Sequence, residues 1–455
     1  MSVTDENVQM GIAGRQASGN DQPPAAPVPL KRRLRRWFYH RLLRLMMLAH
    51  NTALFLAKRL GPKPRQPRDG EGYEILLTGR FESENWAAAH LRPLAMSRHC
   101  SRLLVVSTYP LSPMAKVEVA YPPSWLVRLV GATAARLLLF AWLAVRQRPG
   151  IIGGFHIAGN ALAAICLAPL VGARSVYFCV GGPTEVIDGG VAGEGGPFRK
   201  METPDPVVEA RLLRAIAECD LTVTMGTRAA DFFRAHGACN VHVISGGIDD
   251  RLFKPLHGDR GSDLILVGRL VEIKRINLFL HAVALAAKSR PDITAAIVGE
   301  GPQRPALEQL ARDLGIAQRV RFAGLQQDVG AWLNGSKIFV LTSRSEGLSL
   351  SLMEAMLCGL PAVVSNVGDL GDIVKDGANG YLVGNGSPDT FAARFVDILG
   401  DPGRYSAFSH AARREALRYK IHTAVSLWDD ALARNGTPGI AAGDRVRMPT
   451  PTDTP

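Results

Sequence analysis

The clearest pattern of apolar and polar positions lies in the second half of the chain. A short apolar run at 338–341 is followed by a polar turn, by a run of good helix formers at 350–358, and by a second apolar run at 362–364. Short apolar runs of this kind predict buried strands, and Gly359 and Pro361 end the helix between them. The segment therefore predicts a strand, a loop, a helix and a second strand, the unit that builds a parallel sheet.

The same alternation extends over most of the chain. Further strands are predicted at 75–77, 103–106, 175–180, 221–225, 241–244, 264–267, 295–298 and 319–322. Helical patterns lie between them, and a long helical pattern at 406–432 follows the last strand. The fold class is therefore α/β, and 455 residues are enough for two ordinary domains with tails.

The ends of the chain have a different composition. Residues 1–30 are polar and rich in Pro, Ala and Gly, and residues 436–455 are similar, so both are predicted to be disordered. Residues 31–60 predict a basic, aromatic helix, and 61–70 reads as a linker. The net charge of +12 is concentrated here, because residues 31–68 hold twelve Lys and Arg and no Asp or Glu.

The basic helix predicts contact with an anionic membrane surface. Its apolar part is short and interrupted for a spanning helix, whereas Trp37, Phe38 and Tyr39 beside many arginines suit the membrane interface. A true span, a packing arm and a nucleic-acid-binding tail remain alternatives; we favour the membrane and expect no nucleic acid. A second apolar helix is predicted at 125–145. We expect the rest of the chain to fold without residues 1–68.

Localisation follows from two further observations. The first residues lack the apolar core of a signal peptide, and the six cysteines show neither paired nor metal-ligand spacing. The sequence thus predicts a cytoplasmic protein that is peripheral on the cytoplasmic face of the membrane.

Two glutamates stand out in the segment described first. Glu346 is predicted in the loop at the carboxyl end of a strand, and Glu354 in the first turns of the helix that follows. Ligands of open α/β sheets bind at this edge, and a helix N-terminus there suits a phosphate group. Two solvated glutamates on an ordinary strand–helix unit are the alternative.

The order Glu-Gly-Leu-x5-Glu-Ala-Met-x2-Gly-x-Pro from Glu346 to Pro361 resembles the Glu-x7-Glu signature of family-4 retaining glycosyltransferases. Gly268-Arg269-Leu270-x3-Lys274 resembles a second element of that family. The family usually has glycine after this lysine, where Arg275 stands here, and a Pro-Glu pair at the position of Gly371-Asp372. The resemblance runs from about residue 73 to 432 and is closest in the second half.

The resemblance implies the GT-B fold, with two Rossmann-like domains facing each other across a cleft. It places an acceptor domain at 71–255 and a donor domain at 256–435, whose last helix crosses back to the first domain. It also implies that a nucleotide-sugar, linked to UDP or GDP, is bound as substrate, with no cofactor and no metal.

The resemblance also implies roles for single residues. Glu354 would bind the ribose and Glu346 the donor sugar, while a segment including Leu325 would hold the base. Arg269 and Lys274, with the backbone N–H groups of Leu350 and Ser351, would hold the diphosphate. Gly79 would lie near the donor phosphates, and His156 near the donor sugar. The residues implied as catalytic are Glu346, His156, Arg269 and Lys274.

These roles suit the chemistry, because two fixed cations stabilise the negative charge that grows on a departing diphosphate. The implied function is a metal-independent hexosyltransferase that retains anomeric configuration and uses a lipid-linked or glycan acceptor at a membrane surface. Another GT-B enzyme, such as a sugar-nucleotide epimerase or a phosphorylase, is one alternative. A non-catalytic scaffold that binds nucleotide-sugar is another.

Overall fold

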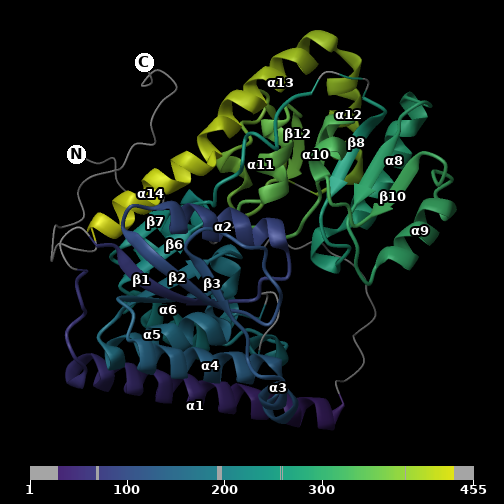
Figure 1. Ribbon diagram of the computed structural model, residues 1–455. Helices are drawn as coiled ribbons and strands as arrows, with labels where there is room; N and C mark the ends of the chain where they lie inside the picture. Colours follow the sequence, from purple (N-terminus) through teal and green to yellow (C-terminus); the bar gives the residue numbers. More distant parts are fainter. Residues whose placement is uncertain are drawn as a thin grey trace, which may run out of the picture.

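The computed structural model describes residues 29–67, 71–191, 197–256, 258, 260–384 and 386–434. The tails predicted to be disordered lie outside this range, apart from Pro29 and Leu30. Two parallel sheets, each covered by helices, form the two lobes seen in Figure 1. The α/β class and the pair of Rossmann-like domains are therefore confirmed.

The first sheet has seven strands in the order β3-β2-β1-β4-β5-β6-β7. Its strands are β1 (Tyr73–Thr78), β2 (Cys100–Val106), β3 (Val117–Ala120), β4 (Ile151–Phe155), β5 (Arg174–Cys179), β6 (Leu221–Thr224) and β7 (Val241–Val243). Its helices are α2 (Glu84–Met96), α3 (Ser124–Val130), α4 (Ala132–Gln147), α5 (Leu162–Val171), α6 (Pro206–Ala217) and α7 (Thr227–Ala235). All five residues of β4 are buried, which explains why this strand reads as continuously apolar.

The second sheet has six strands in the order β10-β9-β8-β11-β12-β13. Its strands are β8 (Ser262–Val267), β9 (Ala295–Val298), β10 (Val320–Gly324), β11 (Ser336–Leu341), β12 (Ala362–Ser365) and β13 (Gly380–Val383). Its helices are α8 (Ile276–Ser289), α9 (Arg304–Asp313), α10 (Val329–Asn334), α11 (Leu350–Leu357), α12 (Pro388–Gly400) and α13 (Pro402–Ala416). The strand order reverses between β8 and β11, and such a switch point is where α/β sheets bind ligands.

Two predicted helices are broken. The pattern at 406–432 forms α13 and then α14 (Ile421–Arg434), separated by a short 3-10 turn at Leu417–Tyr419. The pattern at 125–145 is divided into α3 and α4 by Gly131, whose φ of 82° lies in the left-handed region. Both patterns keep their apolar positions across the break, so periodicity alone predicted one helix.

Helix α14 joins the two domains. It packs against α2 of the first domain, as the resemblance implied. Asp429 on α14 accepts hydrogen bonds from the Ser97 hydroxyl at 2.5 Å and from the Arg98 N–H at 3.0 Å. The last helix of the chain therefore belongs structurally to the first domain.

Helix α7 begins at a second contact between the domains. Asp372 accepts hydrogen bonds from the backbone N–H and the hydroxyl of Thr227, both at 2.6 Å. Asp369 accepts one from the Ala229 N–H at 3.2 Å. Two carboxylates of the second domain thus satisfy the free N–H groups in the first turn of a helix in the first domain.

The basic segment forms one helix, α1 (Leu30–Leu60), which packs on α5 and α6 along the lower side of Figure 1. Leu43, Met47 and Leu54 are 2–3% exposed and belong to the first domain's core. Removing α1 would expose an apolar face of α5 and α6, which argues against the expectation that the rest of the chain folds without residues 1–68.

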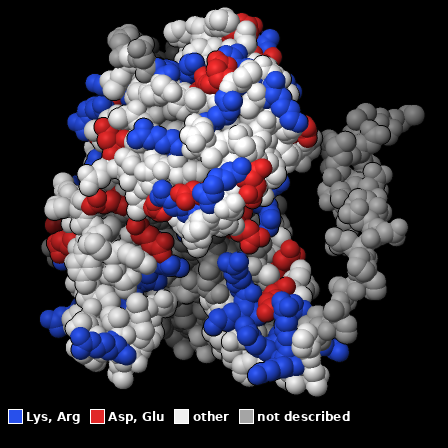
Figure 2. Space-filling model, turned by 90° about the vertical axis from the view of Figure 1, so that its right-hand side faces the viewer, with Lys and Arg blue, Asp and Glu red and all other residues white. Residues whose placement is uncertain are grey.

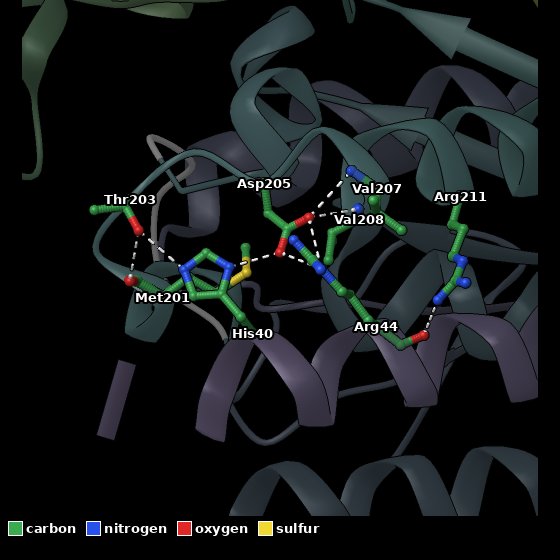
Figure 3. Close-up of polar contacts among 8 residues, drawn as sticks. All are labelled: His40, Arg44, Met201, Thr203, Asp205, Val207, Val208 and Arg211. Carbon is green, nitrogen blue, oxygen red and sulfur yellow. Dashed lines mark hydrogen bonds and ion pairs between the residues drawn. The ribbon is translucent and has the colours of Figure 1, made fainter. Parts of the chain in front are cut away.

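Polar contacts fix α1 in place (Figure 3). The carboxylate of Asp205, the residue that caps α6, accepts hydrogen bonds from His40 at 2.6 Å and from Arg44 at 2.9 Å. Burial alone would raise the pKa of Asp205, but the bonds from His40 and Arg44 hold it below its ordinary value. Arg36 pairs with Glu202 nearby. Among the described residues, no helix has both the length and the apolar character needed to cross a bilayer.

Candidate active site

The candidate site is built at the switch point between β8 and β11. Lys274 lies at the end of the loop after β8, and Glu346 in the loop after β11. The carboxyl ends of neighbouring parallel strands meet at one edge of the sheet, so two loops far apart in sequence are brought together.

Lys274 and Glu346 are in direct contact. The Lys274 Nζ lies 2.6 Å from Glu346 Oε1, and the Ser343 hydroxyl donates to the same oxygen at 2.6 Å. The side chains of Lys274 and Glu346 are 19% and 10% exposed, so the ion pair is shielded from solvent but reachable from the cleft. The sequence predicted that both residues belong to one site, and the structure places them in it.

Helix α11 begins directly after this pair. Ser349 caps the helix, and its hydroxyl accepts a hydrogen bond from the Leu352 N–H. Leu350 and Ser351 form the first turn, where backbone N–H groups have no partner within the helix. The Ser351 hydroxyl donates to the Val267 carbonyl at the end of β8, which ties α11 to the neighbouring strand. The first turn is thus held at the sheet edge where the diphosphate is predicted.

Glu354 lies on α11 and is 7% exposed. Burial raises the pKa of this carboxyl from 4.5 to about 7, because the charged form is penalised in an apolar surrounding. Ribose hydroxyl groups would supply hydrogen bonds that favour the ionised form.

The remaining donor residues predicted from the sequence are spread more widely. Arg269 is exposed in the loop after β8, and Leu325, 79% exposed, follows β10. Gly79 follows β1 and is buried; a side chain at this position would lie 3.1 Å from both Phe81 and Phe155. Gly79 is thus enclosed by aromatic rings, and its donor role, like those of Arg269 and Leu325, stays a prediction.

The second domain's loop meets the first domain at Glu346. Gly347 sits so close to the first domain that a Cβ there would lie 2.2 Å from the Val180 carbonyl oxygen. The Thr184 and Ser345 hydroxyls are 3.4 Å apart across the same contact. The Glu-Gly pair in the signature therefore has a physical reason, because only glycine permits this approach of the two domains.

His156 stands on the facing loop and is held by a glutamate that the sequence did not single out. Its Nδ1 lies 3.0 Å from Glu185 Oε1, and its backbone has a φ of 61°. The Glu185 carboxylate also accepts hydrogen bonds from the Tyr177 hydroxyl and from the backbone N–H groups of Ile157, Val180 and Gly181. Burial alone would raise the pKa of Glu185, but His156 and the N–H donors hold it below its ordinary value.

Glu185 fixes the orientation of His156. An ionised carboxylate at Nδ1 favours a proton on that nitrogen and so sets the tautomer of the ring. Glu185 follows the Gly181-Gly182 turn at the end of β5, and that turn reaches Glu346. A carboxylate placed directly after a glycine turn at the end of a strand was the sequence signal for this residue.

Replacing Glu185 with glutamine is expected to lower the free energy of unfolding by about 2–3 kcal/mol, because an amide NH2 would face donors that now bond to a carboxylate. Denaturant unfolding measures this change. The exposed Glu71→Gln is the matched control. Equal stability of the two variants would show that the bonds to Glu185 are not needed for the fold.

Among the described residues, no three His, Cys, Asp or Glu side chains are grouped as a metal site requires. The ionisable groups described here are the Lys274–Glu346 pair, the His156–Glu185 pair and the buried Glu354.

Comparisons with known proteins show which family the second half of the chain is similar to. Residues 248–415 match the family model described as glycosyl transferases group 1. D-inositol 3-phosphate glycosyltransferase of Thermobispora bispora is 29% identical over 252 residues, 50% of this chain and 57% of that protein. The protein of that name from Frankia alni is 37% identical over 181 residues, 35% of this chain and 43% of its own length. The chain thus spans about half the length of the curated relatives it matches.

Solved structures share the fold. Anabaena Alr3699/HepE in complex with UDP-glucose has a TM-score of 0.62 at 20% identity, covering 80% of this chain and 100% of that one. Sucrose-phosphate synthase from Thermosynechococcus elongatus has a TM-score of 0.61 at 18% identity, covering 80% and 97%. Residues 248–415 therefore match the glycosyl transferases group 1 family, in a chain with the two-domain GT-B fold.

Proposed function

We propose that this protein transfers a sugar from a nucleoside diphosphate to a hydroxyl acceptor, with retention of configuration, at a membrane surface. The observation that carries the proposal is the contact between Lys274 and Glu346, 2.6 Å apart, beside the first turn of α11. A cation, a carboxylate and free N–H groups meet there at the switch point of a parallel sheet. This set suits a ligand that joins a diphosphate to a polyhydroxylated sugar.

In the proposed reaction the protein acts by binding and charge. Lys274, with Arg269 and the first turn of α11, stabilises the diphosphate as it departs, and Glu346 accepts hydrogen bonds from the sugar hydroxyls. The leaving phosphate removes the proton of the attacking acceptor on the same face, so configuration is retained without a protein nucleophile. His156, oriented by Glu185, reaches the sugar from the first domain. No metal ion takes part.

A uridine diphosphate donor is favoured over GDP because several proteins with this fold are solved with UDP or UDP-glucose. The curated relatives are named as D-inositol 3-phosphate glycosyltransferases, which supports transfer to a hydroxyl group. A lipid-linked or glycan acceptor is part of the proposal because of the exposed apolar surface of the first domain, described below.

The test is a thermal-shift screen against UDP, GDP, ADP, CMP and their common sugar conjugates, followed by analysis of donor consumption with and without candidate acceptors. A ligand that binds only the folded state raises the melting temperature. A shift that is specific to one diphosphate and lost in Glu354→Ala supports the donor site. Epimerisation of the donor without an acceptor would favour the epimerase alternative, and binding without turnover would favour the scaffold.

The membrane part of the proposal rests on the outer face of α1. Its helical spacing places Phe38, Leu45 and Leu56 opposite the packed face, and they are 56%, 64% and 48% exposed. Trp125 and Leu129 of α3 are 64% and 73% exposed. Helices α1 and α4 both pack on α5, on the side of the first domain that faces away from the second (Figure 1).

The charge pattern fits an anionic surface. Lys and Arg gather near the lower edge of Figure 2, where the first turns of α1 lie. Arg41 stacks over Trp37 and Arg59 over Phe55. Neither arginine forms an ion pair with any described residue, so their charges remain available to lipid headgroups. Large exposed apolar side chains beside such cations are typical of an interfacial helix.

The triple variant Phe38→Ser, Leu45→Ser, Leu56→Ser is expected to bind vesicles of phosphatidylcholine and phosphatidylserine about tenfold more weakly or worse, since each buried apolar side chain contributes up to about 2 kcal/mol. Vesicle sedimentation measures the affinity. The double variant Leu252→Ser, Leu256→Ser removes exposed leucines elsewhere and should leave the affinity unchanged. Equal binding of the triple variant and wild type would exclude this face of α1 as the membrane contact.

A further inference from the structure

A cavity lies beside the Lys274–Glu346 pair, where β11, β12 and β13 end. It has a volume of about 210 Å³ and is open to solvent on one side. Its polar lining consists of Arg275, Arg344, Ser343 and Ser365. No Asp or Glu of the described chain lines it, so the cavity carries two positive charges and no negative one.

Arg275 occupies an unusual backbone position. It precedes α8 with φ 48° and ψ 44°, the left-handed conformation that glycine adopts without strain. A side chain there costs on the order of 1 kcal/mol. Arg275 lines the cavity, and its guanidinium makes one hydrogen bond to the described part of the chain, at 3.3 Å to the Gly386 carbonyl. A strained arginine with donors directed at a cavity indicates that the side chain serves a ligand.

Two further groups support this reading. Arg344 is largely exposed, and its only ion pair among the described residues is a long one, 4.0 Å, to the exposed Glu272. Ser365 is 3% exposed, and its hydroxyl has no hydrogen-bond partner among the residues that the structure describes. A buried hydroxyl without a partner is costly, and an acceptor oxygen in the cavity would satisfy it.

We propose that this cavity binds an oxyanion, a phosphate or a carboxylate, through Arg275, Arg344 and Ser365. Arginine binds planar or tetrahedral oxyanions through paired N–H groups, and the serine hydroxyl completes the set. This site is distinct from the diphosphate site proposed at Lys274 and α11. It adjoins that site, because Ser343 lines the cavity and also donates to Glu346.

The oxyanion has two sources. It is either a charged substituent of the transferred sugar, such as the carboxylate of a hexuronic acid, or a separate ion held beside the donor. The first source rests on the proposed function, which puts the sugar against Glu346; the second does not.

Titration calorimetry with inorganic phosphate, at constant ionic strength, tests the site without any transfer reaction. Arg275→Gly removes the guanidinium and relieves the backbone strain, so the protein should stay folded while phosphate affinity falls about tenfold or more. Arg344→Gln should weaken binding as well. The exposed Arg312→Gln is the control, and it should bind phosphate as wild type does.

Equal phosphate affinity in wild type and Arg275→Gly, or no phosphate binding at all, would overturn the proposal. Loss of binding in Lys274→Ala but not in Arg275→Gly would place the phosphate at the diphosphate site and would overturn it too.

Donor kinetics then separate the two sources. Arg275→Gly would lose activity with a hexuronic acid donor but keep it with a neutral hexose donor if the oxyanion is part of the sugar. An equal effect on both donors would identify a separate ion. If no donor is turned over at all, the phosphate titration still decides whether the cavity binds an oxyanion.

Discussion

Replacing Lys274 with alanine is expected to lower kcat about a hundredfold, with a smaller change in KM. The charge on the leaving diphosphate grows as the glycosidic bond breaks, so a fixed cation stabilises the transition state more than the bound substrate. The replacement also leaves the Glu346 carboxylate with only the Ser343 hydroxyl as a defined partner. Steady-state rates of donor consumption measure the effect, once the donor has been identified.

The matched control is Lys288→Ala, which removes an exposed lysine from the other end of α8. Its kcat should equal that of wild type. Lys274→Arg keeps the charge and should recover part of the activity. If Lys274→Ala turned over donor at the wild-type rate, Lys274 would not belong to the reacting site.

Glu354→Gln is expected to remove a dependence of stability on pH. The folded-state pKa of Glu354 is raised from 4.5 to about 7, so between these pH values the folded protein binds a proton that the unfolded chain has lost. Stability from this group is therefore greatest at low pH, falls as pH rises through this window, and stays low above it. A shift of this size corresponds to about 3 kcal/mol.

Chemical denaturation at pH 5 and pH 8 measures this difference. Wild type should lose about 2.5 kcal/mol more than Glu354→Gln between the two, whereas the exposed Glu71→Gln should follow wild type. The variant should also bind the nucleoside diphosphate more weakly at pH 8, where wild type presents a carboxylate to the ribose. Parallel pH profiles for wild type and Glu354→Gln would show that this carboxyl ionises freely in the folded protein.

The unit around Glu346 could be predicted because every local signal agreed. A β-branched run forms β11, a serine caps the next helix, and Gly359 with Pro361 ends it. The contact between Lys274 and Glu346 could also be inferred, since both residues follow strands that a parallel sheet places next to each other. The roles of the predicted donor residues beyond this contact stay predictions.

Other features depend on tertiary contacts that periodicity does not record. The sequence of α1 has apolar residues on nearly every side, so it did not show which face docks; the contacts of His40 and Arg44 with Asp205 decide this. Arg136 stands in the middle of an apolar pattern, yet it is buried and donates hydrogen bonds to Gly79 and Asn160. Glu185 was overlooked because its partners, at 156–157 and 177–181, are brought around it only by the fold.

The start of α7, where Asp372 and Asp369 of the second domain cap a helix of the first, would affect how fast substrates and products exchange in the proposed function. If the domains separate at this contact, Asp372 and Asp369 withdraw from Thr227 and Ala229, and the first turn of α7 loses its acceptors. A helix cap contributes about 1–2 kcal/mol, so such opening becomes roughly five- to thirtyfold less populated than it would be without the two carboxylates. In the proposed function, two aspartates outside the donor site would thus help to set the dwell time of a bound nucleotide.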